Sequence, residues 1–340
     1  MVSKTSLWIG TAALVAVPAF LLHAQKAAGV KTPLGLTTII WPKDNAYSAA
    51  KADLGRLLYY DKRISGDGTL SCATCHDPKK GFTDQAPVST GIRGQKGPIS
   101  APTVINRAYG LLQFWNGRAA TLEAQAVGPM ANPIEMGNTH ANVVKTLRGI
   151  AGYRAKFKAV FGAEEFTLDH IAKAIATFER TVLSGDAPYD RYKAGNKAAM
   201  TPAQVRGMDV YFNKAKCDKC HEGPNFTLNA FHNLGIGQDK ATPEEGRFAV
   251  TKDPSHFGQF KTPTLREIEH TFPYMHDGRL KTLEEVVEFY DKGGIKNKNL
   301  DEEMKPLKLT PAQKADLVAF MKALSGRGWQ HLTEPKEFPQ

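Results

Sequence analysis

Two copies of one short motif restrict this chain more than any other feature of its sequence. They are Cys72-Ala73-Thr74-Cys75-His76 and Cys217-Asp218-Lys219-Cys220-His221, and together they contain all 4 cysteines of the 340 residues. Two thiols three residues apart can each add to one vinyl group of a porphyrin, and the histidine that follows is placed to bind its iron. The pattern therefore predicts two covalently bound haem c groups.

Cysteine pairs of this kind also bind zinc or form redox-active dithiols. A zinc ribbon brings its two pairs together over a much shorter stretch than the one between Cys75 and Cys217. A thioredoxin-like pair lies beside a βαβ pattern, which neither motif has, and both copies carry the trailing histidine. We therefore expect haem at both motifs.

Residues 1–24 have the features of a secretory signal peptide. Lys4 precedes an apolar run from Leu7 to Leu22, and Leu22-His23-Ala24 resembles a small-residue cleavage site. The run is somewhat short for a membrane span of about 20 residues, and an uncleaved amino-terminal anchor is the alternative. Because no long apolar stretch follows, the sequence predicts a periplasmic protein without stable membrane insertion.

Length and charge limit the organisation and the partners. The chain exceeds the usual domain size of about 100–200 residues, so we predict two domains with one haem each, residues 25–190 and residues 191–340. Polar and small residues gather near this boundary, from Gly185 to Lys197. The formal net charge is +10, but the lysines are spread along the chain without interleaved aromatic residues. This favours a solvated basic surface and argues against a nucleic-acid partner.

Helical signals dominate, and no run of alternating residues indicates a strand. Thr201-Pro202-Ala203-Gln204 and Thr310-Pro311-Ala312-Gln313 each offer an N-cap, a proline at the first helical position and a glutamine that completes a capping box. Amphipathic periodicity predicts further helices at residues 54–60 and 170–184. The sequence therefore predicts an all-α fold.

Six further segments resemble, in the same order, motifs of the bacterial di-haem cytochrome c peroxidase and MauG family. They are Ala101–Asn106, Phe114–Ala119, Gln125-Ala126, Asn132–Gly137, Phe260–Arg266 and Pro273–Gly278. The resemblance covers nearly the whole chain after residue 24. It implies two cytochrome c-like domains, with the peroxide-reacting haem in the first and the electron-transferring haem in the second.

The resemblance also implies roles for single residues. His76 and His221 would be the proximal ligands of the first and second haem, and Trp115 would pass electrons between the two. Glu135 would be the acid and base above the first iron, with Gln125 beside it. A carboxyl suits this place because peroxide must lose one proton to bind, and its far oxygen must gain one to leave.

Two departures from the usual peroxidase pattern bear on the type of enzyme. Many such peroxidases carry a histidine that caps the first iron until activation, but that position is Ile92 here, and no histidine lies between His76 and His140. The sequence therefore predicts that the first haem is open to peroxide without prior reduction.

The second departure concerns the sixth ligand of the second haem, which is methionine in the peroxidases and tyrosine in MauG. Aligning on Pro273 places Tyr290 there, on a predicted helix whose capping box is Thr282 and Glu285. We favour Tyr290 and keep Met275 as the alternative, because methionine is a common sixth ligand of haem c. A phenolate stabilises higher oxidation states, whereas a thioether raises the potential.

The resemblance implies two further sets of contacts. Arg118, Arg266 and His276 are candidates for binding haem propionates. A calcium ion between the haems would be held by an asparagine side chain and two carbonyls. The carbonyls match Thr271 and Pro273, but the asparagine position is Ser100, which weakens the calcium prediction.

The main hypothesis is a periplasmic di-haem peroxidase that reduces hydrogen peroxide with electrons from a small cytochrome c or cupredoxin. The alternative is a MauG-like enzyme that oxidises tryptophan or tyrosine of a partner protein through a high-valent state of both haems. A di-haem electron carrier without peroxide chemistry is a third possibility, which the motifs around Glu135 disfavour. The resemblance allows a homodimer.

Overall fold

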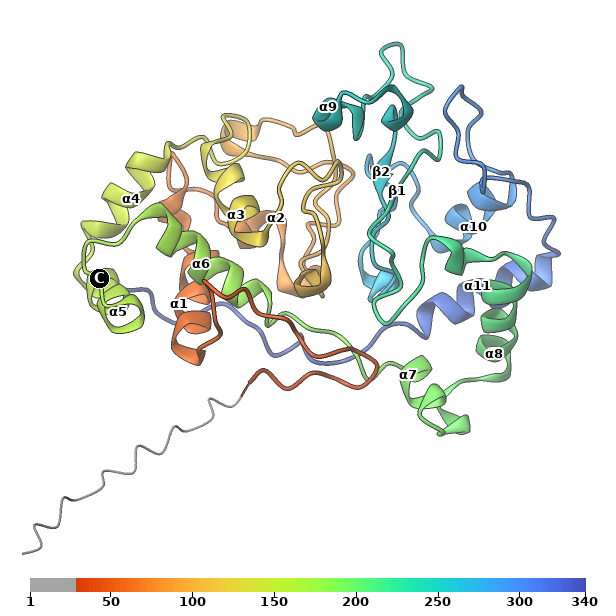
Figure 1. The fold of residues 1–340 in the computed structure, drawn as a ribbon, viewed down its shortest axis with the longest axis horizontal. Helices are drawn as coiled ribbons and strands as arrows, with labels where there is room; N and C mark the ends of the chain where they lie inside the picture. Colours follow the sequence, from red (N-terminus) through yellow and green to blue (C-terminus); the bar gives the residue numbers. More distant parts are fainter. Residues whose placement is uncertain (1–28) are drawn as a thin grey trace, which may run out of the picture.

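The computed structural model describes residues 29–340. The predicted signal peptide, with its alternative as an anchor, lies outside these residues. The described chain forms two mostly helical lobes side by side, which a long amino-terminal segment and the carboxyl-terminal tail both cross (Figure 1). No helix within residues 29–340 is both long enough and apolar enough to cross a membrane.

Each lobe has its own helices. The first lobe contains α1 (Ala49–Tyr60), α2 (Cys72–Cys75), α3 (Leu122–Ala131), α4 (His140–Arg148), α5 (Ala151–Phe161) and α6 (Leu168–Glu179). The second contains α7 (Pro188–Lys193), α8 (Pro202–Asp209), α9 (Phe248–Thr251), α10 (Leu283–Asp291) and α11 (Pro311–Lys322). Its only regular sheet in the described chain is the antiparallel pair β1 (Phe231–His232) and β2 (Phe260–Lys261).

Short turns of 3-10 helix join these elements. They are Lys62–Ile64, Pro78–Lys80, Ile92–Gly94, Arg107–Tyr109, Lys197–Ala199, Cys217–Lys219, Pro254–His256 and Ile268–His270, and a π-helical turn, Val210–Lys214, continues α8. The predicted capping boxes at Thr201 and Thr310 are present and begin α8 and α11. The helix predicted to reach residue 184 ends at Glu179, because the chain turns there toward the second lobe.

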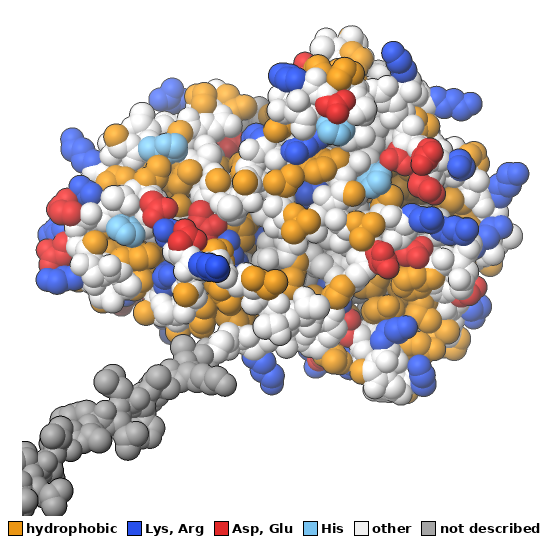
Figure 2. All heavy atoms as spheres, in the orientation of Figure 1, with side chains coloured by type: hydrophobic (Ala, Val, Ile, Leu, Met, Phe, Trp, Pro, Cys, Tyr) orange, Lys and Arg blue, Asp and Glu red, His pale blue; other side chains and the backbone are white. Residues whose placement is uncertain are grey.

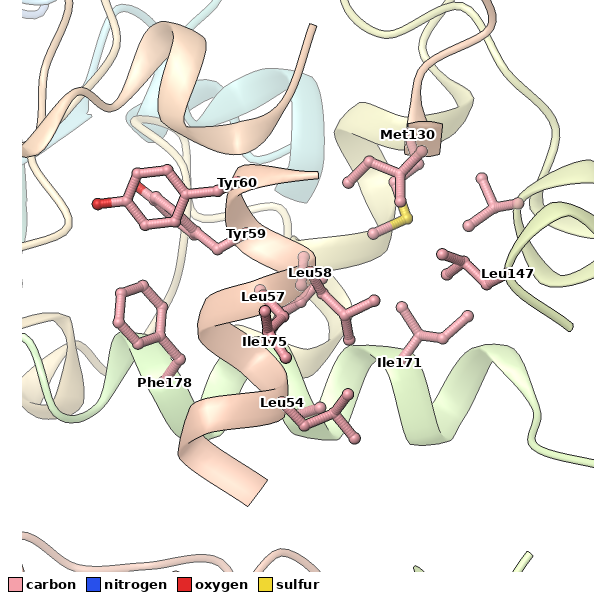
Figure 3. Packing of buried hydrophobic residues seen from close by; sticks show 14 of the residues in the cluster. Leu54, Leu57, Leu58, Tyr59, Tyr60, Met130, Leu147, Ile171, Ile175 and Phe178 are labelled. Atoms are coloured by element: carbon pink, nitrogen blue, oxygen red, sulfur yellow. The ribbon is translucent and has the colours of Figure 1, made fainter. Parts of the chain in front are cut away.

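In each lobe a glycine lets two helices cross closely, α1 with α6 and α8 with α11. A Cβ on Gly55 of α1 would fall 1.9 Å from the carbonyl oxygen of Ala174 in α6, and a Cβ on Gly207 of α8 would fall 1.8 Å from that of Asp316 in α11. Figure 3 shows the first crossing, where leucines of α1 face Ile171, Ile175 and Phe178 of α6. The two lobes therefore repeat the same helix pair.

The two cores are separate, but the ends of the chain tie the lobes together. One cluster of buried apolar residues lies within residues 54–182 and the other within residues 200–324. Trp329, from beyond the second cluster, packs in the first core, and the backbone N–H of Gly152 donates to the carbonyl of Gln340 at 2.7 Å. Figure 1 accordingly shows the carboxyl terminus beside α5. The predicted division into two domains at residue 190 stays a prediction. Residues 329–340 follow the second lobe in the sequence but lie on the first lobe.

Candidate active site

Each Cys-x-x-Cys-His motif lines a cavity of its own. The first cavity has a volume of about 710 Å³ and is lined by Cys72, Cys75 and His76. The second has a volume of about 210 Å³ and is lined by Cys217, Cys220 and His221. Every motif residue that would hold a haem thus faces an interior space, which fits a covalently bound porphyrin in each lobe.

The local fold presents both histidines in the same way. The backbone N–H of His76 donates to the carbonyl of Cys72 at 3.0 Å, and that of His221 donates to Cys217 at 2.9 Å. A buried tyrosine hydroxyl donates to each histidine carbonyl, from Tyr59 at 2.8 Å and from Tyr211 at 2.5 Å. These bonds fix the turn after each second cysteine.

The imidazoles suit iron. Nδ1 of His221 lies 3.2 Å from the carbonyl oxygen of Phe226, which leaves Nε2 for a metal. Burial lowers the pKa of His221 to about 4 and also lowers the pKa of His76. Both rings are therefore neutral near pH 7, as a metal ligand requires.

The thiols argue against the dithiol alternative. Burial raises the pKa of both Cys75 and Cys220 to about 11, and that of Cys217 to about 12. Thiol exchange uses the thiolate, which such surroundings disfavour. Within residues 29–340, no three His, Cys, Asp or Glu side chains converge to hold a metal ion.

One side of the first cavity carries the predicted acid and base. Gln125 of α3 and Glu135, in the loop after α3, both line this cavity. Burial raises the pKa of Glu135, which the positive charge of Arg118 opposes. The Arg118 guanidinium lies 3.4 Å from the ring centre of Phe114, at the same cavity. A carboxyl with a raised pKa in a cavity can both take and return a proton.

Ile92 does not line the first cavity but packs behind its wall. Its side chain is buried, and its backbone N–H donates to the carbonyl oxygen of Glu135 at 2.7 Å. The loop at residues 91–95 is also held by the Gln95 side chain, which donates to the carbonyls of Ile92 and Pro133 at 3.2 and 3.0 Å.

Trp115 lies between the two cavities and lines both. Its indole N–H donates to the carbonyl of Ser100 at 3.0 Å. Its ring centre is 6.2 Å from that of His276, at an edge-to-face angle of 61°. The predicted role of Trp115 in passing electrons between the two haems stays a prediction.

The three predicted propionate contacts differ in position. His276 lines the second cavity, stacks on Phe260 at 3.6 Å, and places Nε2 2.5 Å from Glu244. Arg118 lines the first cavity. Arg266 does not belong with them, because it is buried in a two-pronged ion pair with Asp190 at 2.7 and 2.8 Å and lines neither cavity. Its prediction is corrected to a structural ion pair.

Both candidates for the sixth ligand line the second cavity. Tyr290 lies on α10, which starts at the predicted capping box of Thr282 and Glu285, and burial raises its pKa above the ordinary value. Met275 lines both cavities and has a left-handed backbone, with φ of +70°. Both side chains share a cavity with His221, so geometry alone permits either.

The three calcium candidates also share a cavity. Ser100, Thr271 and Pro273 line the first one. The hydroxyl of Ser100 donates to the carbonyl of Met275 at 3.2 Å, and the backbone N–H of Ser100 donates to the carbonyl of His276 at 2.8 Å.

Five charged residues of the first cavity escaped the sequence interpretation: Arg107, Glu179, Glu244, Glu245 and Lys261. Three of them, Arg107, Glu179 and Lys261, lie inside or beside a quoted motif or a predicted helix, where a charged side chain is usually solvated. Only the fold shows that these three point inward.

Comparison with known proteins identifies the family. Residues 49–198 match the model described as di-haem cytochrome c peroxidase. The chain is 40% identical to the methylamine utilization protein MauG of Methylorubrum extorquens, over 83% of this chain and 80% of that protein. The chain belongs to the di-haem cytochrome c peroxidase family. It is therefore an oxidoreductase of this family, whose members carry haem c.

Other members show how broadly this family is represented. Cytochrome c551 peroxidase of Nitrosomonas europaea is 39% identical, over 82% of this chain and 81% of that protein. A solved structure, titled a MauG-like protein associated with microbial copper homeostasis, is 36% identical, with a TM-score of 0.84. The match covers 91% of this chain and 99% of the chain in that structure. Members named as peroxidases and as MauG thus resemble this chain to the same degree.

Proposed function

We propose that this protein is a periplasmic di-haem peroxidase that reduces hydrogen peroxide to water. The observation that carries the proposal is the wall of the first cavity, where Glu135 and Gln125 face the space in front of His76. Each peroxide takes up two electrons and two protons and yields two waters. The electrons come from a small cytochrome c or cupredoxin.

The residues of the first lobe supply the proton chemistry. Haem c held in this cavity would supply the iron at which peroxide is reduced. The Glu135 carboxylate takes a proton from the incoming peroxide and returns it to the departing oxygen. Burial raises its pKa and thereby brings it closer to the working pH. Gln125 holds the peroxide oxygens by hydrogen bonds from its amide.

His76 and Pro129 support an open first iron. His76 would bind on one side. Pro129 of α3 lines the cavity at the place equivalent to Tyr290 of α10, because the two helices begin at corresponding N-caps, Thr121 and Thr282. A proline side chain has no ligand atom. The first lobe therefore offers no counterpart of Tyr290.

Trp115 supports an electron path between the lobes. It lines both cavities, so the indole bridges the two haem sites. A second haem held by His221 would supply the entry point for donor electrons, and Trp115 would lie on the path from it to the first haem site.

A MauG-like activity is the second candidate, and Tyr290 favours it. Phenolate ligation would stabilise the oxidised second haem, so that it shares oxidising charge. The enzyme would then use peroxide to oxidise a tryptophan or tyrosine of a partner protein. That side chain, and not a small redox protein, would supply the electrons that reduce peroxide.

Three further assignments belong to this proposal. The periplasm is the proposed location because haem c is attached outside the cytoplasm. A homodimer is the second assignment, and light scattering of the purified protein tests it. Calcium at Ser100, Thr271 and Pro273 stays a prediction. Metal analysis before and after EDTA treatment tests it.

Peroxide turnover with a reduced donor tests the main proposal. The haem-loaded protein should oxidise two molecules of reduced cytochrome c or cupredoxin for each peroxide. Glu135→Gln should abolish most of this activity, and Glu164→Gln, at an exposed site, should leave it unchanged. If peroxide is consumed only when a tryptophan- or tyrosine-bearing protein is oxidised, the MauG-like function replaces the peroxidase. If peroxide is consumed in neither assay, both fail.

A further inference from the structure

A buried lysine lies between the two cavities. Lys261 is the second residue of β2, and its backbone N–H donates to the carbonyl of Trp115 at 2.8 Å. The residue is only 6% exposed, yet it lines both cavities. No acidic side chain of residues 29–340 forms an ion pair with it. Burial, and then the positive charge of Arg107, lower its pKa well below the ordinary value.

A second cation in the first cavity is also uncompensated. The guanidinium of Arg107 donates to the amide oxygen of Gln113 at 2.6 and 3.1 Å, and to the carbonyl of Leu112 at 3.1 Å. These acceptors are neutral. Burial lowers the pKa of Arg107 to about 10, so it stays charged near pH 7.

Glu179, the acid whose charge acts on Arg107, does not neutralise it. Glu179 lines the same cavity, and burial raises its pKa to about 8. It is therefore largely protonated near pH 7, and its Oε2 has no hydrogen-bond partner in the described chain. Glu244 also lines this cavity, but it is engaged with His276 and Lys240. A buried guanidinium and a buried ammonium that have no ion-pair partner are costly unless an anion joins them.

We infer that Arg107 and Lys261 form a carboxylate-binding site for the haem propionates. Arg107 lines the first cavity alone, so it would bind the first haem, and a guanidinium can hold a carboxylate by two parallel bonds. Lys261 lines both cavities, so it would serve carboxylates of both haems. Arg107 and Lys261 would thus bind the propionates that the sequence analysis assigned in part to Arg266.

This arrangement has an electrical consequence. A nearby positive charge favours the reduced haem, because reduction adds one negative charge. The positive charge of Lys261 therefore raises the reduction potentials of both haems. The positive charge of Arg107 chiefly raises the reduction potential of the first haem. Lys261 in this way links the two redox centres.

Redox titration of the haem-loaded protein tests the inference. Lys261→Met should shift both potentials to more negative values, and Arg107→Gln should shift chiefly the first. Lys261→Arg, which keeps the charge, should restore both potentials. Lys214→Met removes an exposed lysine near the second motif and is the matched control, for which no shift is expected.

Several outcomes would overturn the assignment. Unchanged potentials in Lys261→Met would show that the lysine meets no propionate, and a shift of one haem alone would refute the sharing. If Lys261→Met fails to retain both haems, Lys261→Gln is titrated instead and judged by the same criteria. The inference concerns only how this chain holds its haems, so it stands or falls independently of peroxide turnover.

Discussion

The backbone N–H of Ile92 donates a hydrogen bond of 2.7 Å to the carbonyl oxygen of Glu135. The segment that contains Ile92 is therefore fastened to the loop that carries the proposed acid and base. The neighbouring Gly91 packs so closely that a Cβ there would fall 1.9 Å from the carbonyl oxygen of Ile134. We therefore expect a displacement of one loop to displace the other.

Gly91→Ala should disturb peroxide chemistry without loss of haem. The added methyl would push the loop of Ile134 and Glu135 away from its place, so the carboxyl would no longer meet peroxide. We expect a fall in the second-order rate constant of at least about tenfold, since misplacing a reacting group costs this much or more. Stopped-flow mixing with peroxide measures it.

The control for this change is Gly97→Ala in the same loop region. A Cβ on Gly97 would meet no atom closer than 3.7 Å, at the carbonyl of Ser89, so its rate should match the unaltered protein. Equal rates for both variants would contradict the coupling of the two loops.

Glu135→Gln should slow the reaction with peroxide by about 10²–10⁴-fold, the usual contribution of a general acid and base. In the unaltered protein, the rate should rise with pH through the pKa of Glu135, because the ionised carboxylate takes the first proton. Since burial raises this pKa, the rise should lie above pH 4.3, the ordinary value for glutamate. A rate that does not change with pH in either protein would remove Glu135 from the mechanism.

Tyr290→Phe should convert the second haem from six-coordinate to five-coordinate, and Tyr290→Met should raise its reduction potential, because a thioether replaces a phenolate. Visible and electron paramagnetic resonance spectra with redox titration follow both changes. Met275→Leu is the companion variant. If it alters the spectrum of the second haem while Tyr290→Phe does not, Met275 is the ligand.

Gly207→Ala should destabilise the second lobe. Its Cβ would lie 1.8 Å from the carbonyl of Asp316, so α8 and α11 must move apart. Overpacking of this kind costs about 1–3 kcal/mol or more, which urea unfolding of the haem-loaded protein measures. Gly29→Ala is the control, because no atom lies within 4 Å of its Cβ. Equal stability of both variants would contradict the close helix crossing.

The sequence predicts much of this fold because its signals are local. Cysteine spacing marks both haem motifs, and the capping boxes at Thr201 and Thr310 begin helices where expected. Contacts between distant segments leave no such signal. The ion pair of Arg266 with Asp190 joins residues 76 positions apart. Trp329 follows the second core in the sequence but packs in the first core.

Charge placement shows the same division. Figure 2 shows basic side chains scattered among acidic ones over the visible face, as the spread of lysines along the chain predicts. The inward direction of Lys261 and Arg107 depends instead on tertiary packing, between the lobes for Lys261 and within the first lobe for Arg107. A basic residue inside a motif reads identically whether it is solvated or buried.

Adding hydrogen peroxide to the fully ferric protein tests the central claim most directly. An open first haem and tyrosine ligation of the second predict an immediate spectral change, with a near-infrared band from charge shared between the haems. If the spectrum stays unchanged until one haem has been reduced, the first haem is capped in the ferric protein. That result would contradict both the open cavity beside Glu135 and the preference for Tyr290.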